Sequence, residues 1–321
     1  MFRGAIVIDG HADILYQMGC RRCSYYDPAA PLHQSYAHLA ASGVDLQVFV
    51  TFVDPDRAPG EQLYKVLNRL HAYRSEVERP DAVRTVLTAA DLRALAADRE
   101  AGGRARHALL SVEGADALNG EMAVLDTWFR LGVRLVGLTW NGANCLADGV
   151  GELRGAGLTN FGRDVVRRMQ TLGMLVDVSH LSPRGVSDVL EMAEKPVVAS
   201  HSNAQSVHRH RRNLDDGQIR AVAAGGGLVG ATFVPAFIGD RQPVNSDDLL
   251  RHIDRMLTVA GPDAVGLGSD FDGIEETPSD LRNGSDYPIL LNKLEEHFGV
   301  DVARKVMGGN WFRVLSQTLP A

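Results

Sequence analysis

Eight short apolar runs, each followed by a stretch with helical periodicity, constrain the fold of this chain more than any other feature. The runs are rich in β-branched residues and nearly continuous in hydrophobicity, as expected of parallel strands buried on both faces, whereas half-exposed antiparallel strands would alternate. They cover residues 6–13, 44–52, 108–113, 133–139, 174–180, 196–201, 227–233 and 264–270. Strands that alternate with helices in this way predict an α/β protein with a (β/α)8 TIM barrel.

The segments between and after the runs complete this expectation. Helical patterns occupy residues 60–78, 122–131, 160–172, 183–193, 215–224 and 246–260. Segments at about 14–43 and 53–107 exceed ordinary barrel connections, so we expect extra helices or loops there, and closing helices at about 286–318 with a break at Gly308 and Gly309. No repeat or linker marks a boundary, which favours one domain over residues 1–321. A doubly wound sheet is the alternative, but no phosphate-binding glycine motif follows the first run.

Composition and charge narrow the class of protein. The net charge of -7 argues against a nucleic-acid-binding protein, because such a partner requires a basic face. The sequence has no apolar run of about 18 residues, and residues 1–10 hold no apolar stretch long enough for a secretion signal. We therefore expect a cytoplasmic protein without a membrane partner.

The three cysteines do not form a complete disulfide framework, because their number is odd. Cys20 and Cys23 have the spacing of a redox motif or a zinc knuckle, but no second pair of this kind accompanies them. We expect Cys20, Cys23 and Cys145 to be free thiols, the first two in a loop.

Acidic and imidazole side chains gather at the predicted carboxyl ends of the strands, where barrel enzymes place their chemistry. The first run ends in His11 and Asp13, which share one face of a strand because they are two residues apart. Later runs end in Glu113, His180, His201 and Asp270. Taken singly, a histidine here could be a hydrogen-bonded wall residue, and an aspartate could cap a helix or form a turn. Six such residues at strand ends favour one shared site.

Five of these side chains offer more nitrogen and oxygen ligands than one zinc ion normally takes from protein, which suggests two metal ions. In the simplest arrangement His11 and Asp13 hold one Zn²⁺, His180 and His201 hold the other, and Glu113 bridges both. A carbamylated lysine is the other common bridge, but none of the four lysines ends a predicted strand. A water between two zinc ions would be a hydroxide near neutral pH, and Asp270 would exchange protons with it as general base and then general acid.

Six motifs carry a resemblance to a known family. They are Asp9-Gly-His-Ala-Asp13, Ser111-Val-Glu-Gly114, Asp177-Val-Ser-His180, Ser200-His-Ser202, Arg211-Arg-Asn213 and Gly266-Leu-Gly-Ser-Asp-Phe-Asp-Gly273. In these motifs and in their order the chain resembles the membrane (renal-type) dipeptidases, the M19 metallopeptidases, in their soluble bacterial form. The resemblance implies a barrel of the metal-dependent amidohydrolase type, with two zinc ions on the five ligands above and Asp270 as the proton carrier. It also implies a possible homodimer.

The resemblance further implies substrate contacts. Arg212 would clamp the terminal carboxylate of the substrate, because a guanidinium pairs with a carboxylate in a bidentate fork. Without the family, residues 209–212 would be interpreted as a solvated basic loop. Gly273, which ends the last motif, is a further candidate contact.

The chain departs from the family at two substrate positions. Trp140 stands where members often carry a histidine, and Val234, within Phe233-Val-Pro235, replaces a tyrosine. Trp140 either packs against its neighbours or stacks on substrate.

These observations predict a zinc-dependent dipeptidase that hydrolyses small dipeptides with a free C-terminal carboxylate through a zinc-bridging hydroxide. One alternative is a related binuclear amidohydrolase that acts on another small amide or ester, such as an N-acyl amino acid or a lactam. The other is a non-catalytic binding protein on an inherited barrel, whose signature would be the loss of a metal ligand. The sequence leaves open the physiological substrate and the L or D configuration of its second residue.

Overall fold

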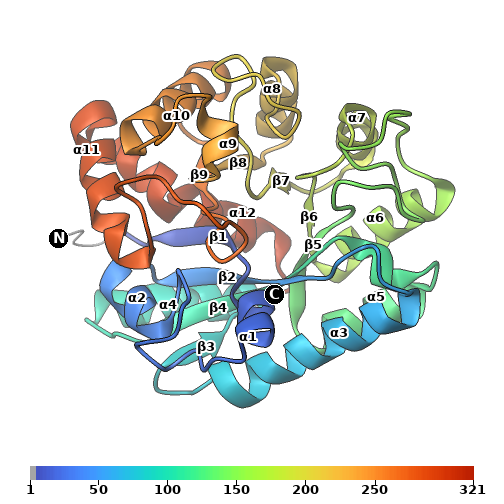
Figure 1. The fold of residues 1–321 in the computed structure, drawn as a ribbon, viewed down its shortest axis with the longest axis horizontal. Helices are drawn as coiled ribbons and strands as arrows, with labels where there is room; N and C mark the ends of the chain where they lie inside the picture. Colours follow the sequence, from blue (N-terminus) through green and yellow to red (C-terminus); the bar gives the residue numbers. More distant parts are fainter. Residues whose placement is uncertain (1–4) are drawn as a thin grey trace.

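The computed structural model describes residues 5–321, and residues 1–4, the start of the stretch considered above for a secretion signal, lie outside it (Figure 1). Eight parallel strands form a nearly closed barrel in the order β1-β2-β4-β5-β6-β7-β8-β9. Their bounds are β1 Ile8–Ala12, β2 Leu46–Phe52, β4 Arg106–Glu113, β5 Val133–Gly137, β6 Leu175–Asp177, β7 Val197–Ala199, β8 Leu228–Ala231 and β9 Val265–Leu267. Each predicted apolar run contains one of these strands or overlaps it closely, so the predicted fold class is confirmed.

The first and last strands meet through backbone and side-chain hydrogen bonds. The Asp13 amide donates to the Phe271 carbonyl at 2.8 Å, and the Asp270 amide donates to the His11 carbonyl at 3.0 Å. Behind them, the buried Asp9 carboxylate accepts hydrogen bonds from the Ser269 amide at 2.9 Å and the Ser269 hydroxyl at 2.7 Å. These contacts tie the two ends of the chain of strands together and bring His11 next to Asp270.

Helices surround the strands, as Figure 1 shows. The helices that follow successive barrel strands are α5 Met122–Arg130, α6 Asn160–Leu172, α7 Pro183–Met192, α8 Asp216–Ala224, α10 Ser246–Ala260 and α11 Tyr287–Arg304. Several begin at a side-chain cap that satisfies free backbone amides. For example, Thr159 accepts from the Gly162 amide and Ser182 from the Gly185 amide.

The long connections contain additional elements. Residues 14–43 hold α1 Ile14–Arg21 and α2 Tyr36–Ser42, and residues 53–107 hold α3 Pro59–Ala72, a π-helical turn Tyr73–Val77, β3 Val83–Thr85 and α4 Ala89–Glu100. Strand β3 pairs with β4 outside the barrel order, and its three residues are too short to give a periodic signal. Cys20 lies in the last turn of α1, so its predicted place in a loop is wrong, although all three cysteines are free.

The C-terminal segment closes the end of the barrel that lies opposite the carboxyl ends of the strands. Helix α11 is interrupted at Gly299, which has a φ of 78°, and a π-helical segment Lys305–Gly309 leads into α12 Asn310–Thr318. Trp311 donates from its indole nitrogen to the Leu267 carbonyl at 2.9 Å. A Cβ added at Gly10 would lie 2.0 Å from the Trp311 ring, so this inward position of β1 accepts no side chain.

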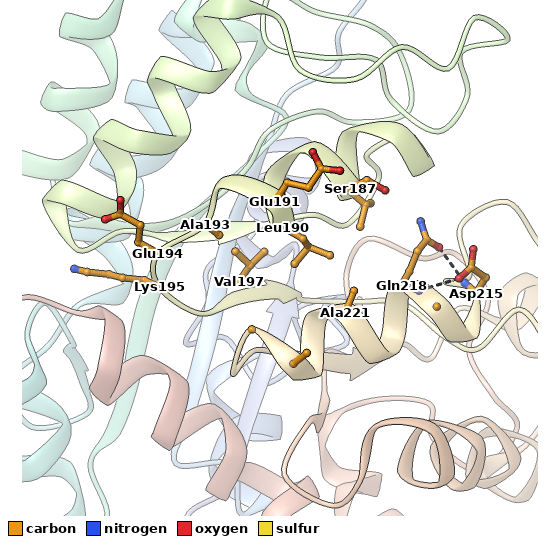
Figure 2. A pocket seen from close by; sticks show the side chains of 14 residues that line it. Ser187, Leu190, Glu191, Ala193, Glu194, Lys195, Val197, Asp215, Gln218 and Ala221 are labelled. Carbon is orange, nitrogen blue, oxygen red and sulfur yellow. Dashed lines mark hydrogen bonds between the residues drawn. The ribbon is translucent and has the colours of Figure 1, made fainter.

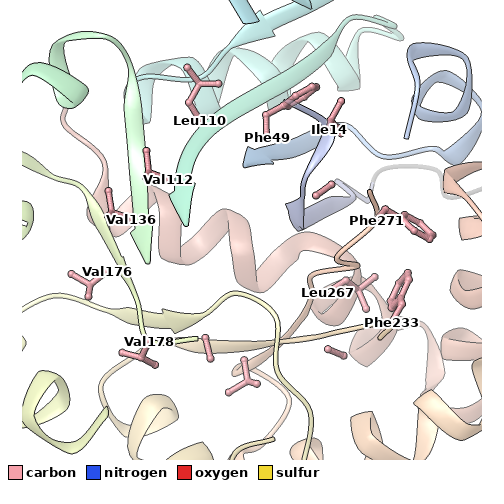
Figure 3. Close-up of a cluster of buried hydrophobic side chains, with 14 of the residues drawn as sticks. Ile14, Phe49, Leu110, Val112, Val136, Val176, Val178, Phe233, Leu267 and Phe271 are labelled. Atoms are coloured by element: carbon pink, nitrogen blue, oxygen red, sulfur yellow. The ribbon is translucent and has the colours of Figure 1, made fainter. Parts of the chain in front are cut away.

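Because successive side chains along a strand point to opposite faces, the buried apolar residues form two clusters. One packs strands against helices, and Figure 3 shows part of it, with Val112, Val136 and Val176 on neighbouring strands. The other includes Leu109, Leu175 and Val198 together with Trp311 of α12. Successive side chains of a strand point to opposite faces, so residues two or four positions after Leu109, Leu175 and Val198 return to that inner face. This register directs Glu113, Asp177 and Ser200 toward the barrel axis at its open end.

One short helix, α9 Pro235–Ile238, and two 3-10 turns, Ala115–Leu118 and Gly284–Asp286, complete the elements. Within residues 5–321 no helix has both the length and the apolar character needed to cross a bilayer.

Candidate metal centre

The predicted site residues lie at the carboxyl ends of their strands, but only some of them belong to the strands. His11 is in β1 and Glu113 is the last residue of β4, whereas His180, His201 and Asp270 lie in turns just beyond β6, β7 and β9. Six of the eight strands, all except β2 and β4, end one to three residues earlier than their apolar runs. His180 and Asp270 have φ values of 68° and 65°, in the left-handed region that non-glycine residues seldom adopt. Such strain persists where the surroundings impose it, most often at functional sites.

The Glu113 carboxylate is the centre of the cluster. Its Oε1 atom lies 2.9 Å from His180 Nε2, 3.3 Å from His201 Nε2 and 3.8 Å from His11 Nε2. His180 Nε2 and His201 Nε2 are themselves 2.9 Å apart. One carboxylate thus faces three imidazoles that come from three different strands of the barrel.

Two more carboxylates complete the cluster on the side of β1. Asp13 Oδ2 lies 3.5 Å from His11 Nε2, and Asp270 Oδ1 lies 4.0 Å from the same atom. His11, Asp13 and Glu113 form one group whose ligand atoms lie within 4.8 Å of one another, and Glu113, His180 and His201 form a second. The two groups share Glu113.

The chemistry of these groups fits bound cations. His11 Nε2 and Asp13 Oδ1 are buried and have no hydrogen-bond partner within the described chain, which is costly for polar atoms inside a protein. Imidazole nitrogens and carboxylate oxygens are the ligands that zinc takes. The residues present therefore suit a metal site, and the unpartnered atoms point to where the ions would bind.

The charged groups of the cluster shift one another's pKa values. Burial raises the pKa of Glu113, but the charges of His11 and His180 outweigh it and hold that pKa well below its ordinary value. Burial lowers the pKa of His11, but the surrounding carboxylates raise it to about 10. Burial raises the pKa of Asp270 well above its ordinary value, and neighbouring Asp13 adds to this effect.

A cavity of about 510 Å³ opens onto the cluster. Its walls include Trp140, Val234 and Gly273, together with Arg212 and Asp270. The centroid of the Trp140 ring lies 5.2 Å from that of the Phe52 ring and 6.1 Å from that of the His180 ring, so the indole joins an aromatic wall beside the candidate metal ligands. A Cβ added at Gly273 would lie 2.4 Å from both Asp13 Oδ2 and Asp270 Oδ1, which explains the absence of a side chain there.

Arg212 is a buried cation on this cavity. It is 5% exposed, its Nη2 donates to the His201 carbonyl at 3.1 Å, and its Nε has no hydrogen-bond partner among residues 5–321. Burial lowers the pKa of its guanidinium, against the attraction of Glu113 and Asp270. Neighbouring Arg211 is exposed and behaves as part of a solvated loop. A buried guanidinium with a free donor suits an anionic ligand group.

Three residues next to the ligands had no role assigned from the sequence. Asn141 Oδ1 lies 2.8 Å from His180 Nδ1, and Ser200 Oγ lies close to both His11 and His201. Asp177 accepts hydrogen bonds from the Ser179 amide, the Ser200 amide and the Ser200 hydroxyl. Its proximity to His11 and His201 makes a third geometric group, but its oxygens are already engaged behind the site. Ser200 and Asp177 lie within the quoted motifs, which is the signal that could have indicated them, whereas Asn141 lies outside those motifs.

A larger hollow lies away from the cluster. It has a volume of about 800 Å³ and runs between α7 and α8, with Leu190 and Ala221 on its two sides (Figure 2). None of its 14 lining residues is a histidine, and none belongs to the metal cluster. The larger hollow is therefore separate from the candidate metal centre.

Comparison with known proteins agrees with the geometry. The family model described as membrane dipeptidase (peptidase family M19) matches residues 1–320. A solved metallopeptidase of family M19, dipeptidase AC, is 26% identical with a TM-score of 0.89, covering 99% of this chain and 100% of that one. A metallopeptidase from Rhodobacter sphaeroides, solved with a phosphinate mimic of the dipeptide L-Ala-D-Ala, is 25% identical with a TM-score of 0.88, covering 98% and 99%.

A curated relative extends the comparison at higher identity. An uncharacterised dipeptidase of Schizosaccharomyces pombe is 37% identical over 219 residues, which are 65% of this chain and 52% of that protein. The match of the family model over almost the whole length decides the assignment. The chain belongs to the membrane dipeptidase family, peptidase family M19, and is a metallodipeptidase.

Proposed function

We propose that this protein is a binuclear zinc dipeptidase that hydrolyses small dipeptides with a free C-terminal carboxylate. The observation that carries the proposal is the Glu113 carboxylate, shared by two ligand groups, in a cavity that also holds the buried cation Arg212. Two cations beside a fixed guanidinium suit a small substrate that has both an amide to cleave and a carboxylate to bind.

The proposal assigns every metal ligand except Glu113 to one of the two zinc ions. His11 and Asp13 would hold one Zn²⁺ and His180 and His201 the second, and Glu113 would serve both. Zinc bound there would supply a Lewis acid for the scissile carbonyl and would activate a water molecule as the nucleophile near neutral pH.

The chain's own side chains then orient the substrate and move the proton. Arg212 pairs with the terminal carboxylate, which fixes the position of the amide relative to Glu113. Asp270 takes a proton from the attacking water and delivers it to the leaving amine. Its carboxylate lines the cavity 4.0 Å from His11 Nε2 and belongs to neither ligand group, so it is free to take up and release this proton.

The walls of the cavity select the substrate. We place Trp140 against a substrate side chain, since its ring already extends the aromatic wall formed with Phe52. Gly273 allows the substrate close to Asp13 and Asp270, because any side chain would occupy that space.

A solved relative indicates which stereochemistry of the substrate to test. The Rhodobacter sphaeroides relative was solved with a mimic of L-Ala-D-Ala, which makes L,D-dipeptides a substrate class to test beside L,L-dipeptides. A second candidate function is hydrolysis of an N-acyl amino acid or a lactam, and it is favoured by Trp140 and Val234, which make this part of the cavity apolar.

The test compares four substrates on zinc-loaded protein. We expect kcat/KM to be highest for a dipeptide, L-Ala-L-Ala or L-Ala-D-Ala, and to fall strongly for the C-amidated dipeptide, which cannot pair with Arg212. N-acetyl-L-alanine keeps the carboxylate but lacks the free amine. Cleavage of this compound with no cleavage of either dipeptide would replace the proposal by the second candidate.

A further inference from the structure

The hydroxyl of Ser200 lies between two histidines that the proposed site assigns to different metal ions. Ser200 Oγ is 3.2 Å from His11 Nδ1 and 2.8 Å from His201 Nδ1. It also donates to Asp177 Oδ2. Ser200 is fully buried and the two imidazole ring centroids are 3.8 Å apart, so the three side chains form one packed unit.

The direction of each hydrogen bond follows from the number of protons available. A serine hydroxyl has one proton and two lone pairs. Asp177 receives that proton, because its Oδ2 faces the hydroxyl and its Oδ1 accepts the Ser179 and Ser200 amides, each at 2.9 Å. Both lone pairs of Ser200 therefore remain for the Nδ1–H groups of His11 and His201. With Nδ1 protonated, each histidine presents an unprotonated Nε2 to the centre of the cluster.

We propose that Ser200, held by Asp177, is a positioning residue that fixes the tautomer and the ring orientation of His11 and His201 together, and so adjusts the affinity of both metal ions at once. This inference rests on the two-zinc site proposed above. Partners behind metal-binding histidines commonly have this effect, but here a single hydroxyl serves ligands of two ions.

The third histidine is positioned independently. His180 Nδ1 lies 2.8 Å from Asn141 Oδ1, and this contact involves neither Ser200 nor Asp177. Loss of Asn141 should therefore disturb only the ion that His180 binds. Ser202 offers a matched control, because it is fully buried two residues from Ser200 and its hydroxyl has no hydrogen-bond partner among the described residues.

The experiment is a competitive zinc titration of four proteins prepared free of metal: wild type, Ser200→Ala, Asn141→Ala and Ser202→Ala. We expect Ser200→Ala to raise both zinc dissociation constants by about 10- to 100-fold. Asn141→Ala should raise one of them, and Ser202→Ala should raise neither. Thermal melting of the metal-free proteins shows whether each variant is folded.

Asp177→Asn is a second variant that leaves the hydroxyl in place. The amide oxygen of the asparagine would accept the two backbone amides, and its NH2 would donate to Ser200 Oγ. The hydroxyl proton then turns toward a histidine, which makes that Nδ1 an acceptor and gives the wrong tautomer for zinc binding at Nε2, or toward Ser179 Oγ at 3.5 Å. In both cases Ser200 has only one lone pair left for the two histidines. We expect weakened zinc binding, which a purely space-filling role of Ser200 would not produce.

The outcomes separate the two proposals. If wild type binds two zinc ions and Ser200→Ala binds both unchanged, or weakens only one, the inference is wrong while the proposed site stands. If wild type binds fewer than two, the proposed site is wrong, and long-range ¹H–¹⁵N spectra of the histidines decide the inference. Protonated Nδ1 in both His11 and His201, changed in Ser200→Ala, supports it, and spectra unaltered by the substitution overturn it.

Discussion

Asp270 is the residue to which we assign proton transfer. Its backbone lies in the left-handed region, and its carboxylate is 4.0 Å from His11 Nε2 without being needed by either ligand group. We predict that Asp270→Asn keeps its zinc but loses kcat by about 10²- to 10⁴-fold, the usual contribution of a general acid–base. Zinc content and steady-state kinetics on a dipeptide check this. Full turnover in the variant would remove Asp270 from the mechanism.

Arg212 and Arg211 are neighbours with opposite environments, one buried at the cavity and one exposed. We predict that Arg212→Ala lowers kcat/KM for free dipeptides by roughly 10- to 100-fold, mainly through KM, because a charge-assisted hydrogen bond is lost. Arg211→Ala should leave both constants unchanged. An equal loss on C-amidated dipeptides would contradict the carboxylate clamp.

Single residues were predictable from the sequence where their type and position were both unusual. A glutamate directly after an apolar strand, as at Glu113, is costly to bury alone and thus indicated a site. Ser200 and Asn141 gave no such signal, because serine and asparagine occur in many turns and caps. Their place beside the histidines depends on distances between different strands, which sequence patterns do not contain.

At the scale of elements, the turn after β9 is built around close contacts. Gly273 lies against Asp13 and Asp270, with no room for a Cβ, whereas a Cβ at Gly142 would meet only Glu152 Oε1 at 3.9 Å. We predict that Gly273→Ala displaces one of the two carboxylates and lowers zinc content or kcat at least about tenfold, and that Gly142→Ala has little effect. Metal analysis and kinetics of both variants measure the difference. Wild-type behaviour of Gly273→Ala would show that the turn adjusts.

The same turn holds the segment that follows α1. Asp272 accepts hydrogen bonds from the His33 amide at 2.7 Å and the Gln34 amide at 3.1 Å. Burial raises the pKa of this carboxyl to about 7 from an ordinary value of 3.8, although the two amides lower it. Between pH 3.8 and about pH 7, the Asp272 carboxyl therefore keeps its proton in the folded state and loses it in the unfolded state.

This difference in proton binding gives a pH dependence with a definite sign. The contribution of Asp272 to the free energy of unfolding is present at low pH and is lost as pH rises through about 7, by at most about 1.4 kcal/mol per pH unit. We predict that the stability of wild type relative to Asp272→Asn falls between pH 5 and pH 8. Urea unfolding of both metal-free proteins tests this. A constant difference over that range would mean that Asp272 is ionised throughout.

Strands and helices were predictable from the sequence when they were long enough to show a clear hydrophobic pattern. All eight barrel strands were found because buried parallel strands leave apolar runs. The ends of all barrel strands except β2 and β4 were placed one to three residues too late, since the apolar runs continue beyond the residues that pair. Strand β3 and the π-helical turn at Tyr73–Val77 escaped detection, because one is very short and the other shares the periodicity of α3.

At the scale of the whole molecule, the fold and the site have separate sources of stability. The inner apolar cluster around Leu109, Leu175 and Trp311 fills the barrel below the mouth, and the metal ligands line the mouth itself. The core of the barrel consists of apolar side chains that are separate from the candidate ligands. We therefore expect metal removal to abolish activity while the protein stays folded, so that activity can be restored by titration.

That titration is the most direct test of a dipeptidase site that needs two zinc ions. Metal-free protein is titrated with Zn²⁺ while hydrolysis of L-Ala-L-Ala and L-Ala-D-Ala is followed and bound zinc is counted by mass spectrometry. Our account predicts that dipeptide hydrolysis rises to a plateau at two zinc ions per chain and that Glu113→Gln never reaches it. A plateau at one ion, or two bound ions with neither dipeptide cleaved, would contradict it.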